Sequence, residues 1–183
     1  LIGCGKMGSA MLHGWLSDSG LDAEFLIVEP AQDHLSWTAS HDNVHLHGSV
    51  AGAAADGRAA TMVVLAVKPQ MMDEAIADLG ALAGLDTAFL SIAAGLSTAW
   101  LRDRLGDGAL VLRSMPNMPA AIGKGVTALY CGDAPEPVAS LATQLLRAIG
   151  EVVILDDEGL MDAVTAVSGS GPAYIFLLAE VMT

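Results

Sequence analysis

Basic side chains are scarce in this chain of 183 residues. It has eight lysines and arginines against 21 aspartates and glutamates, so its formal net charge is −13. Binding to nucleic acid phosphates requires clustered Lys and Arg side chains, and their scarcity argues against a nucleic acid partner. Aromatic residues make up only 4% of the chain, whereas 53% of its residues are hydrophobic. The hydrophobic fraction predicts a large core, and the heavy use of Ala and Gly suits helices packed closely on a sheet.

Cysteines and long apolar runs are also scarce. Cys4 and Cys131 are the two cysteines of the sequence. They do not make a disulfide framework, and neither has a metal-ligating partner at a useful spacing. We therefore expect a reducing, cytoplasmic location and no metal site. The best apolar run, residues 163–179, is interrupted at residues 168–172, so we also expect no membrane span.

Short β-branched or apolar runs alternate with helical patterns in the first part of the chain. The predicted strands are residues 25–28, 44–47, 61–67, 88–93, 109–113, 126–131 and 152–155, and the predicted helices are residues 7–18, 33–40, 71–82, 98–105 and 136–149. This alternation predicts a Rossmann-like α/β fold, a doubly wound and mostly parallel sheet. Only Leu1 and Ile2 precede the first glycine turn, so we expect the chain to be a piece of a longer protein.

The pattern changes after Leu155. Residues 156–159 form an acidic hinge, and residues 160–167 and 173–182 are predicted helices with few polar positions. Residues 174–178 are apolar on all sides, which a surface helix does not tolerate, so we expect burial in a second domain or a subunit interface. The predicted domains are a dinucleotide-binding domain at residues 1–156 and the beginning of an all-α dimerisation domain at residues 157–183.

The peptide Gly3-Cys4-Gly5-Lys6-Met7-Gly8 is typical of a turn that binds nucleotide phosphates. In such a turn the first glycine permits the bend, the second lets the backbone approach a diphosphate, and the third lets the helix lie close to the strand. The first N–H groups of the helix would bind the phosphates. Glu29 would accept a hydrogen bond from a ribose 2′-hydroxyl and repel a 2′-phosphate, which favours NAD; a solvated acid at a strand end is the alternative. The predicted cofactor-binding residues of this half are Gly3, Gly5, Lys6, Met7, Gly8 and Glu29.

Three further peptides follow predicted strands, at residues 66–70, 91–95 and 113–119. Because ligands of open α/β sheets bind outside the carboxyl ends of the strands, we expect all three to meet at the nicotinamide. Prolines stiffen these loops, and small residues leave room for a flat ring. For any single loop, ordinary punctuation of a strand end is the alternative. The predicted cofactor-binding residues of this half are Ala66, Val67, Lys68, Pro69, Ala93, Ala94, Gly95, Met115, Pro116 and Asn117.

The catalytic candidates are Lys68 and Asn117, which would orient the nicotinamide ribose or nearby waters. All five histidines lie in the first 47 residues, so none follows these loops as a catalytic base would. A structural role is the alternative for Lys68, and Arg113 is expected to brace a loop. Ser170 or Gly171 would cap a helix start whose N–H groups hold a substrate carboxylate, with a simple helix–helix joint as the alternative.

Together these motifs resemble the pyrroline-5-carboxylate reductase family. They occur in the family's order over the whole chain, and the motifs after the glycine turn are the more specific ones. The matching peptides are Gly3-Cys4-Gly5-Lys6-Met7-Gly8 with Ala10-Met11 and Gly14-Trp15-Leu16, then Ala66-Val67-Lys68-Pro69-Gln70, Ser91-Ile92-Ala93-Ala94-Gly95, Arg113-Ser114-Met115-Pro116-Asn117-Met118-Pro119, residues 123–127 and Ser168-Gly169-Ser170-Gly171-Pro172-Ala173-Tyr174.

The resemblance implies NAD(P)H-dependent reduction of Δ1-pyrroline-5-carboxylate to L-proline, by hydride transfer to the C=N carbon. It also implies a helical domain that interlocks two subunits in a homodimer or a larger ring. The substrate would lie between the nicotinamide and that domain, near a Ser/Thr/Gly-rich loop beyond residue 183. The family commonly uses NADPH and many members use NADH, whereas Glu29 favours NADH.

Two other functions compete with this one. A β-hydroxyacid-dehydrogenase-like oxidoreductase would need a catalytic lysine on the helical segment, and residues 163–183 contain none. A non-catalytic regulator that senses nicotinamide nucleotides would not need the Met-Pro-Asn loop.

Overall fold

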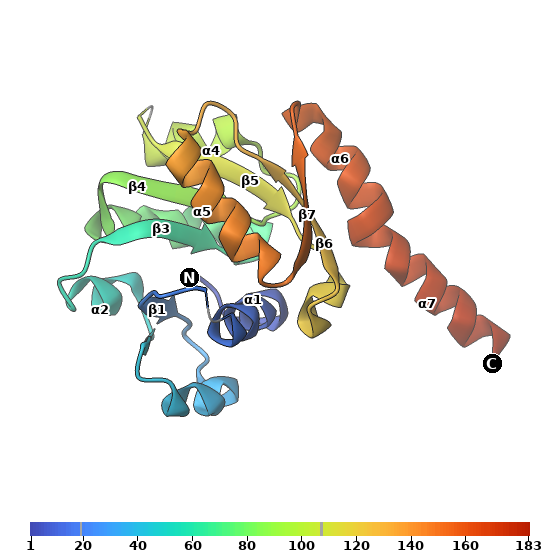
Figure 1. The fold of residues 1–183 in the computed structure, drawn as a ribbon, viewed down its shortest axis with the longest axis horizontal. Coiled ribbons are helices and arrows are strands. Elements are labelled where there is room, and N and C mark those ends of the chain that lie inside the picture. The colour runs from blue at the N-terminus through green and yellow to red at the C-terminus, as the bar shows by residue number, and fades with distance from the viewer. Residues whose placement is uncertain (19, 107) are drawn as a thin grey trace.

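The computed structural model describes residues 1–18, 20–106 and 108–183, and its centre is a sheet with helices on both faces (Figure 1). The strands are β1 (Phe25–Val28), β2 (Val44–His47), β3 (Ala60–Leu65), β4 (Ala83–Ser91), β5 (Leu110–Met115), β6 (Gly125–Tyr130) and β7 (Gly150–Leu155). The α-helices are α1 (Lys6–Ser17), α2 (Val50–Ala54), α3 (Met72–Ala77), α4 (Thr98–Leu105), α5 (Glu136–Arg147), α6 (Met161–Val164) and α7 (Gly171–Met182). The 3-10 segments are η1 (Asp33–Ser40), η2 (Pro69–Met71), η3 (Leu79–Ala81), η4 (Met118–Ile122) and η5 (Glu158–Leu160), and η6 (Thr165–Ser170) is π-helical.

The first three residues complete the sheet between β1 and β3. Ile2 forms parallel bridges to Val28 and Leu65. The N–H group of Ile2 donates to the carbonyl of Val64, and that of Gly3 donates to the carbonyl of Val28, both at 2.8 Å. The strand order is therefore β2-β1-Ile2-β3-β4-β5-β6-β7, and only the β5–β6 pairing is antiparallel among these neighbours. This order corresponds to that of a Rossmann sheet, so the predicted doubly wound, mostly parallel fold is confirmed.

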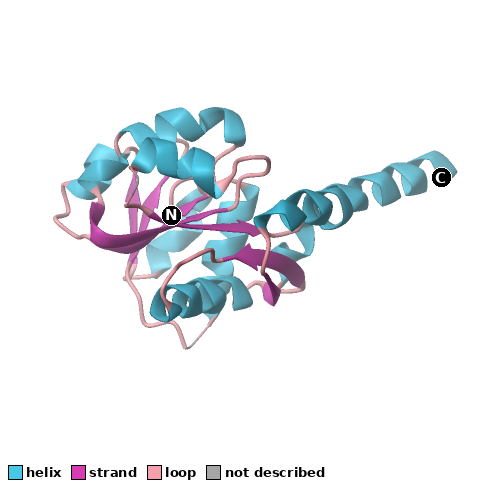
Figure 2. Cartoon of the chain, turned by 90° about the horizontal axis from the view of Figure 1, so that it is seen from above, coloured by secondary structure: helices cyan, strands magenta, loops and turns pink. Residues whose placement is uncertain are grey.

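Two aliphatic clusters cover the two faces of the sheet. Successive strand residues point to opposite faces, so Phe89 packs with α2, α3 and α4 while Leu90 packs with α1 and α5. The indole N–H of Trp15 on α1 donates to the carbonyl of Leu145 on α5 at 2.9 Å. A Cβ atom on Gly14 would lie 2.6 Å from a backbone carbonyl oxygen just after α5, so this glycine permits the close packing of α1. Figure 2 shows the helices on either side of the strands.

The segment before β4 differs from the prediction. The single helix predicted at residues 71–82 is wrong, because the chain forms η2, α3 and η3 there and β4 already begins at Ala83. Gly80 lies in this stretch and weakens a helix by its backbone entropy. The patterns also miss α2, which is too short to show a helical period. Its one local signal is Ser49, whose hydroxyl oxygen accepts the N–H group of Gly52 at 3.1 Å.

The carboxyl-terminal ends of β3, β4 and β5 also differ from the predictions, which changes the residues that lie in the loops after them. β3 ends at Leu65 and β4 at Ser91, so residues 66–67 and 92–93 lie in loops. β5 continues to Met115. The three loops therefore begin at Ala66, Ile92 and Pro116, at the carboxyl-terminal ends of the strands.

The C-terminal segment forms one continuous helix, Glu158–Met182, from η5 through α7. The predicted interruption at residues 168–172 is wrong, because Thr165–Ser170 is π-helical and leads directly into α7. A proline lacks the N–H group that an α-helix would use at this point, and a π-helical segment is one way to absorb that loss. Among the described residues this is a helix long and apolar enough to cross a membrane, by length and composition alone.

The far half of this helix extends away from the sheet (Figure 1, Figure 2). Its large apolar side chains are all more than half exposed in the single chain: Tyr174, Ile175, Phe176, Leu177, Leu178, Val181 and Met182. A contiguous apolar surface of this kind marks an interaction site.

Arg113 on β5 anchors the start of the C-terminal helix. Its side chain is buried and donates to Glu158 at 3.2 Å, and its second contact is Asp162 at 3.8 Å. Glu158 also accepts the N–H group and the hydroxyl of Thr98, both at 2.7 Å. A buried guanidinium is tolerated when it is paired, so this network fixes the predicted acidic hinge at residues 156–159 to the sheet. We expect Arg113 to brace a loop, whereas the structure shows that it braces the first residues of the C-terminal helix.

Replacing Glu158 with glutamine should weaken this anchor in a pH-dependent way. Burial raises the pKa of Glu158, but the hydrogen bonds from Thr98 and Arg113 outweigh it and hold the pKa below its ordinary value of 4.5. A carboxyl group with a depressed pKa stabilises the fold at pH 7 and loses this effect as the pH falls through the folded-state value. We expect Glu158→Gln to lower the free energy of unfolding by about 2 kcal/mol at pH 7, measured by urea denaturation.

The matched control is Glu151→Gln, which removes an exposed carboxylate from β7 and should change stability little. The difference between the wild type and Glu158→Gln should shrink as the pH falls from the ordinary carboxyl value of 4.5 through the lower folded-state pKa of Glu158. A difference that stays constant as the pH falls through this range would contradict the role given to the ion pair.

Candidate functional site

The loop between the first strand residues and α1 has the geometry of a phosphate-binding turn. Gly3 has a φ of +86°, and a Cβ atom there would lie 2.8 Å from the side chain of Val67. Gly8 packs directly against the carbonyl oxygen of Gly3, so α1 starts close to the sheet. Apart from Gly5 itself and its two chain neighbours, no heavy atom of the described residues lies within 4 Å of the Cβ position of Gly5. The loop is therefore closely packed at two glycines and open to a ligand at the third.

The beginning of α1 fits an anionic group. Gly5 is the N-cap residue of α1, and none of the described side chains caps this end. The first N–H groups of a helix have no partner inside it, so they are available to phosphate oxygens. Lys6 is exposed at the first helical position, where its charge would add to this attraction, and Met7 is half-buried. The residues present therefore fit a dinucleotide diphosphate.

Cys4 is the point at which neighbouring elements hold the loop. Its N–H group donates to Oε2 of Glu29 at 2.8 Å. Its carbonyl oxygen accepts the Ser9 hydroxyl at 2.8 Å and lies 2.8 Å from Nε2 of His34. Burial raises the pKa of the Cys4 thiol, although its contact with Ser9 lowers it, so the thiol stays protonated and serves the packing of the loop. Sequence patterns did not single out Ser9 or His34, because neither belongs to the glycine motif.

The loops after β3, β4 and β5 lie at the same edge as the glycine turn. The three strands pair in parallel, so their carboxyl ends point the same way. The N–H group of Ala66 donates to the carbonyl of Ile2 at 2.8 Å, and its Cβ atom lies 3.7 Å from the Cβ position of Gly8. The first of the loops is thus packed directly against the glycine turn.

The residues predicted to bind the nicotinamide half differ in their solvent exposure. Lys68 and Gly95 are exposed, whereas Ala93 and Pro116 are buried. The half-buried ones are Ala66, Val67, Pro69, Ala94, Met115 and Asn117. The buried members can only shape the backbone of the edge, and the others can present atoms to a ligand.

Asn117 joins the loop after β5 to two other parts of the molecule. Its Oδ1 atom accepts the N–H group of Val126 at the start of β6, at 3.0 Å. Its Nδ2 atom donates to the hydroxyl of Ser168, in the π-helical segment, at 3.0 Å. Beside it, a Cβ atom on Gly169 would lie 2.7 Å from the terminal methyl group of Met115. The C-terminal helix therefore meets the carboxyl edge through Ser168 and Gly169.

Ser170 and Gly171 have a different setting from the one we predicted. The predicted helix start is wrong, since both residues have helical backbone angles inside the continuous helix. Their N–H groups therefore do not form a free helix terminus. Ser170 is exposed and Gly171 half-buried. The residues of this peptide that contact the carboxyl ends of the strands are Ser168 and Gly169, which belong to the same motif but are not among the predicted site residues.

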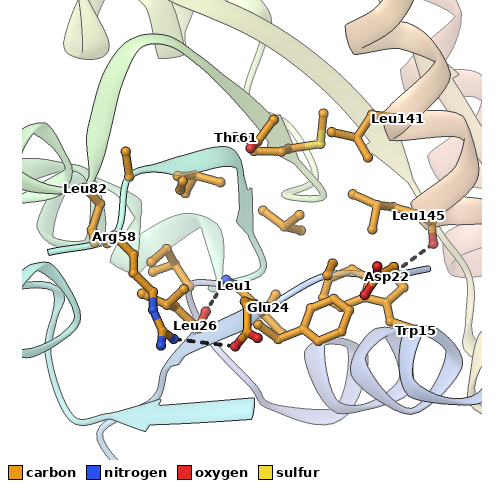
Figure 3. Close-up of a pocket in the computed structure, with 18 residues that line it drawn as sticks. Leu1, Trp15, Asp22, Glu24, Leu26, Arg58, Thr61, Leu82, Leu141 and Leu145 are labelled. Atoms are coloured by element: carbon orange, nitrogen blue, oxygen red, sulfur yellow. Dashed lines mark hydrogen bonds and ion pairs between the residues drawn. The ribbon is translucent and has the colours of Figure 1, made fainter. Parts of the chain in front are cut away.

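A cavity of about 560 Å³ lies near the amino-terminal ends of β1 and β3, away from the loops described above (Figure 3). It is lined by residues 22–26 and 58–64, which lead into β1 and β3 and form the first parts of these strands, and by Leu1, Ile2, Trp15, Leu82, Leu141 and Leu145. Arg58 and Glu24, 3.5 Å apart, lie among its polar residues. Because the predicted dinucleotide site is at the carboxyl ends of the strands, this cavity is not part of it.

Comparison with known proteins supplies a family for this arrangement. The family model described as "NADP oxidoreductase coenzyme F420-dependent" matches residues 1–95. The model described as "Pyrroline-5-carboxylate reductase dimerisation" matches residues 158–183, the continuous C-terminal helix.

Curated relatives match over the whole chain. The pyrroline-5-carboxylate reductase of Haemophilus influenzae is 39% identical over 183 residues, which is 99% of this chain and 66% of the relative. That of Pseudomonas aeruginosa is 38% identical over 100% of this chain and 66% of the relative. That of Synechocystis sp. is 36% identical over 191 residues, 100% of this chain and 67% of the relative.

Solved structures of pyrroline-5-carboxylate reductases have the same fold as this chain. A pyrroline-5-carboxylate reductase from Coxiella burnetii has a TM-score of 0.85 at 29% identity, covering 98% of this chain and 66% of that one. The enzyme from Streptococcus pyogenes has a TM-score of 0.79 at 28% identity, with coverages of 98% and 66%. The chain thus spans about two thirds of the length of these proteins. By sequence identity along its whole length and by the match of its C-terminal helix, it belongs to the pyrroline-5-carboxylate reductase family.

Proposed function

We propose that this protein reduces Δ1-pyrroline-5-carboxylate to L-proline with NADH or NADPH. The observation that carries the proposal is the carboxyl edge of the sheet, where an open glycine turn lies beside the loops after three parallel strands. Relatives that bear the name of this enzyme match the chain at 32–39% identity. Neither competing function has a feature of the described residues in its favour.

The dinucleotide would lie along this edge. The residues that would hold its diphosphate are Gly3, Gly5, Lys6, Met7 and Gly8, and those that would hold its nicotinamide half are Ala66, Val67, Lys68, Pro69, Ala93, Ala94, Gly95, Met115, Pro116 and Asn117. When bound, reduced nicotinamide supplies a hydride that forms the new C–H bond at the imine carbon of the protonated substrate, while the imine π pair becomes the amine lone pair. Positioning two rings face to face accounts for much of the rate of such a reaction.

Asn117 acts in this proposal as a positioning residue, because it ties the loop after β5 to the helix that carries Ser168. Lys68, exposed in the loop after β3, orients the ribose or a water beside the ring. Ser170 and Gly171 remain the proposed substrate residues because they directly follow Ser168 and Gly169, which contact Asn117 and Met115. Since they form no free helix terminus, the exposed hydroxyl of Ser170 would bind the substrate carboxylate in place of helix N–H groups. These roles predict separate kinetic effects. Loss of Asn117 or Lys68 would disturb the alignment of the rings and lower kcat, whereas loss of Ser170 would weaken substrate binding and raise KM.

The first test is oxidation of NADH and of NADPH by the protein at its natural full length, followed at the absorbance band of reduced nicotinamide. We expect oxidation that depends on added Δ1-pyrroline-5-carboxylate. Asn117→Ala and Lys68→Ala should each lower kcat by about tenfold, because the reacting rings lose alignment. Ser170→Ala should mainly raise the KM for the substrate.

The matched control is Asn43→Ala. Asn43 donates to the carbonyl of Ala23 at 3.0 Å, at the other edge of the sheet, so its loss should leave both kinetic constants unchanged. Substrate-independent or absent oxidation with both coenzymes would refute the proposed reaction. Equal effects of Asn43→Ala and Asn117→Ala would refute the role given to Asn117.

We also propose that the exposed C-terminal helix pairs with a second copy of the chain. Burial of its apolar side chains against a partner removes their contact with water, and the matching family model carries dimerisation in its description. In this proposal the helix is covered by protein, not by lipid, and the protein stays in the cytoplasm. The proposed assembly is therefore a homodimer or a larger oligomer built from homodimers.

Ile175→Asp should disrupt this assembly, because a buried carboxylate without a partner is costly in an apolar interface. Ile175 is 64% exposed in the single chain, so the substitution should not disturb the chain's own core. Sedimentation velocity should show the wild type as a dimer or larger and the variant as a smaller species. Ala99→Asp places the same charge on an exposed position of α4 and should leave the assembly intact. A monomeric wild type, or recovery of the protein in the membrane fraction, would contradict the proposal.

A further inference from the structure

We infer that Glu29 makes this protein select NADH over NADPH, an inference that rests on the proposed dinucleotide site. Glu29 follows the last residue of β1, at the edge where the glycine turn lies. Its Oε2 atom accepts the N–H group of Cys4 at 2.8 Å, and its Oε1 atom accepts that of Ala31 at 3.1 Å. Two backbone donors on opposite oxygens therefore hold the carboxylate in place beside the turn.

A carboxylate in this position distinguishes the two coenzymes by charge and by hydrogen bonding. Two carboxylate oxygens offer about four acceptor sites, so the two backbone donors leave capacity for another. A ribose 2′-hydroxyl can donate to the remaining capacity. A 2′-phosphate is anionic and offers acceptors, so it would face the carboxylate with neither a proton to share nor an opposite charge.

No cationic side chain in the adjoining segment offsets this repulsion. Residues 30–44 contain neither lysine nor arginine, and Asp33 adds a second acidic group. His34 is occupied with the carbonyl oxygen of Cys4, at 2.8 Å. Glu29 also cannot turn away without giving up its hydrogen bond to the glycine turn, so the turn would keep the negative charge next to the ribose of a bound dinucleotide.

The test measures binding, independently of turnover, on the protein at its natural full length. Fluorescence titrations give the Kd of NADH and NADPH, and competition gives the Kd of ADP-ribose and of its 2′-phosphate derivative. We expect each ligand without the 2′-phosphate to bind about tenfold more tightly than its phosphorylated counterpart. Equal affinities, or tighter binding of the phosphorylated ligands, would overturn the inference.

The variant Glu29→Gln removes the charge and retains an oxygen that can accept the Cys4 N–H group. It should shift the NADPH-to-NADH affinity ratio about tenfold toward NADPH, and Glu29→Ser with Ala31→Arg should shift it further. The control Glu151→Gln removes one charge from β7, at the other end of the strand order, and should leave the ratio unchanged. An unchanged ratio in a folded Glu29→Gln protein, as judged by thermal unfolding, would overturn the inference.

If Glu29→Gln does not fold, the competition measurements on the wild type decide the matter. The outcome is also separable from the proposed reaction. Tighter binding of ADP-ribose than of its 2′-phosphate derivative, without reduction of Δ1-pyrroline-5-carboxylate, would support the inference about Glu29 and refute the proposed reaction. Reduction of the substrate with a preference for NADPH would do the reverse.

Discussion

The hydrogen bonds that hold the first three residues between β1 and β3 determine where the rest of the carboxyl edge lies. Ile2 and Gly3 donate to Val64 and Val28 on either side, and the chain turns immediately afterwards into α1. The glycine turn therefore begins at the point where the strand order reverses, the position at which open α/β sheets bind ligands. Because Gly8 packs on Gly3, the amino end of α1 is fixed at the same place. The position of the proposed cofactor site therefore depends on the pairing of the first three residues between β1 and β3.

A second set of contacts connects this edge to the C-terminal helix. Arg113 and Glu158 fix the beginning of the helix to β5, and Asn117 fixes its π-helical part to the following loop. Both attachments come from one strand and the loop after it. A substrate bound between the nicotinamide and the helix would thus lie between two surfaces held by the same segment. The described residues provide no such attachment for the far half of the helix, which suits a surface that a second subunit covers.

Sequence patterns predict the parts of the fold that follow from simple periodicity. Alternation of apolar runs and helical patterns predicts the seven strands and most of the helices. The glycine turn is identified by its spacing together with its context, a helix after it and Glu29 at the end of the next strand. Alternation cannot locate where β4 starts, because Ala83 joins the sheet through pairing with Ala60, far away in sequence. It also cannot detect the continuous helix, since Gly and Pro at residues 169–172 are ordinary signs of a helix end.

The candidate site shows the same division. The glycines and the strand-end loops could be predicted because their residue types have direct geometric consequences. Ser9, His34 and Ser168 could not, because their importance depends on contacts made in the folded chain: two hold Cys4 and one receives a hydrogen bond from Asn117. Glu29 combines both cases. Its place at a strand end is visible in the sequence, whereas the hydrogen bond that fixes it to the glycine turn is visible only in the structure.

The most direct measurement of the central claim is amide hydrogen exchange of the natural full-length protein with and without ADP-ribose. Binding at the reversal point of the sheet predicts slower exchange at residues 3–8 and in the loop at residues 66–69, with no change around the cavity at the amino edge, at residues 22–26 and 58–61. Unchanged exchange at residues 3–8, or protection confined to the residues around that cavity, would contradict the account.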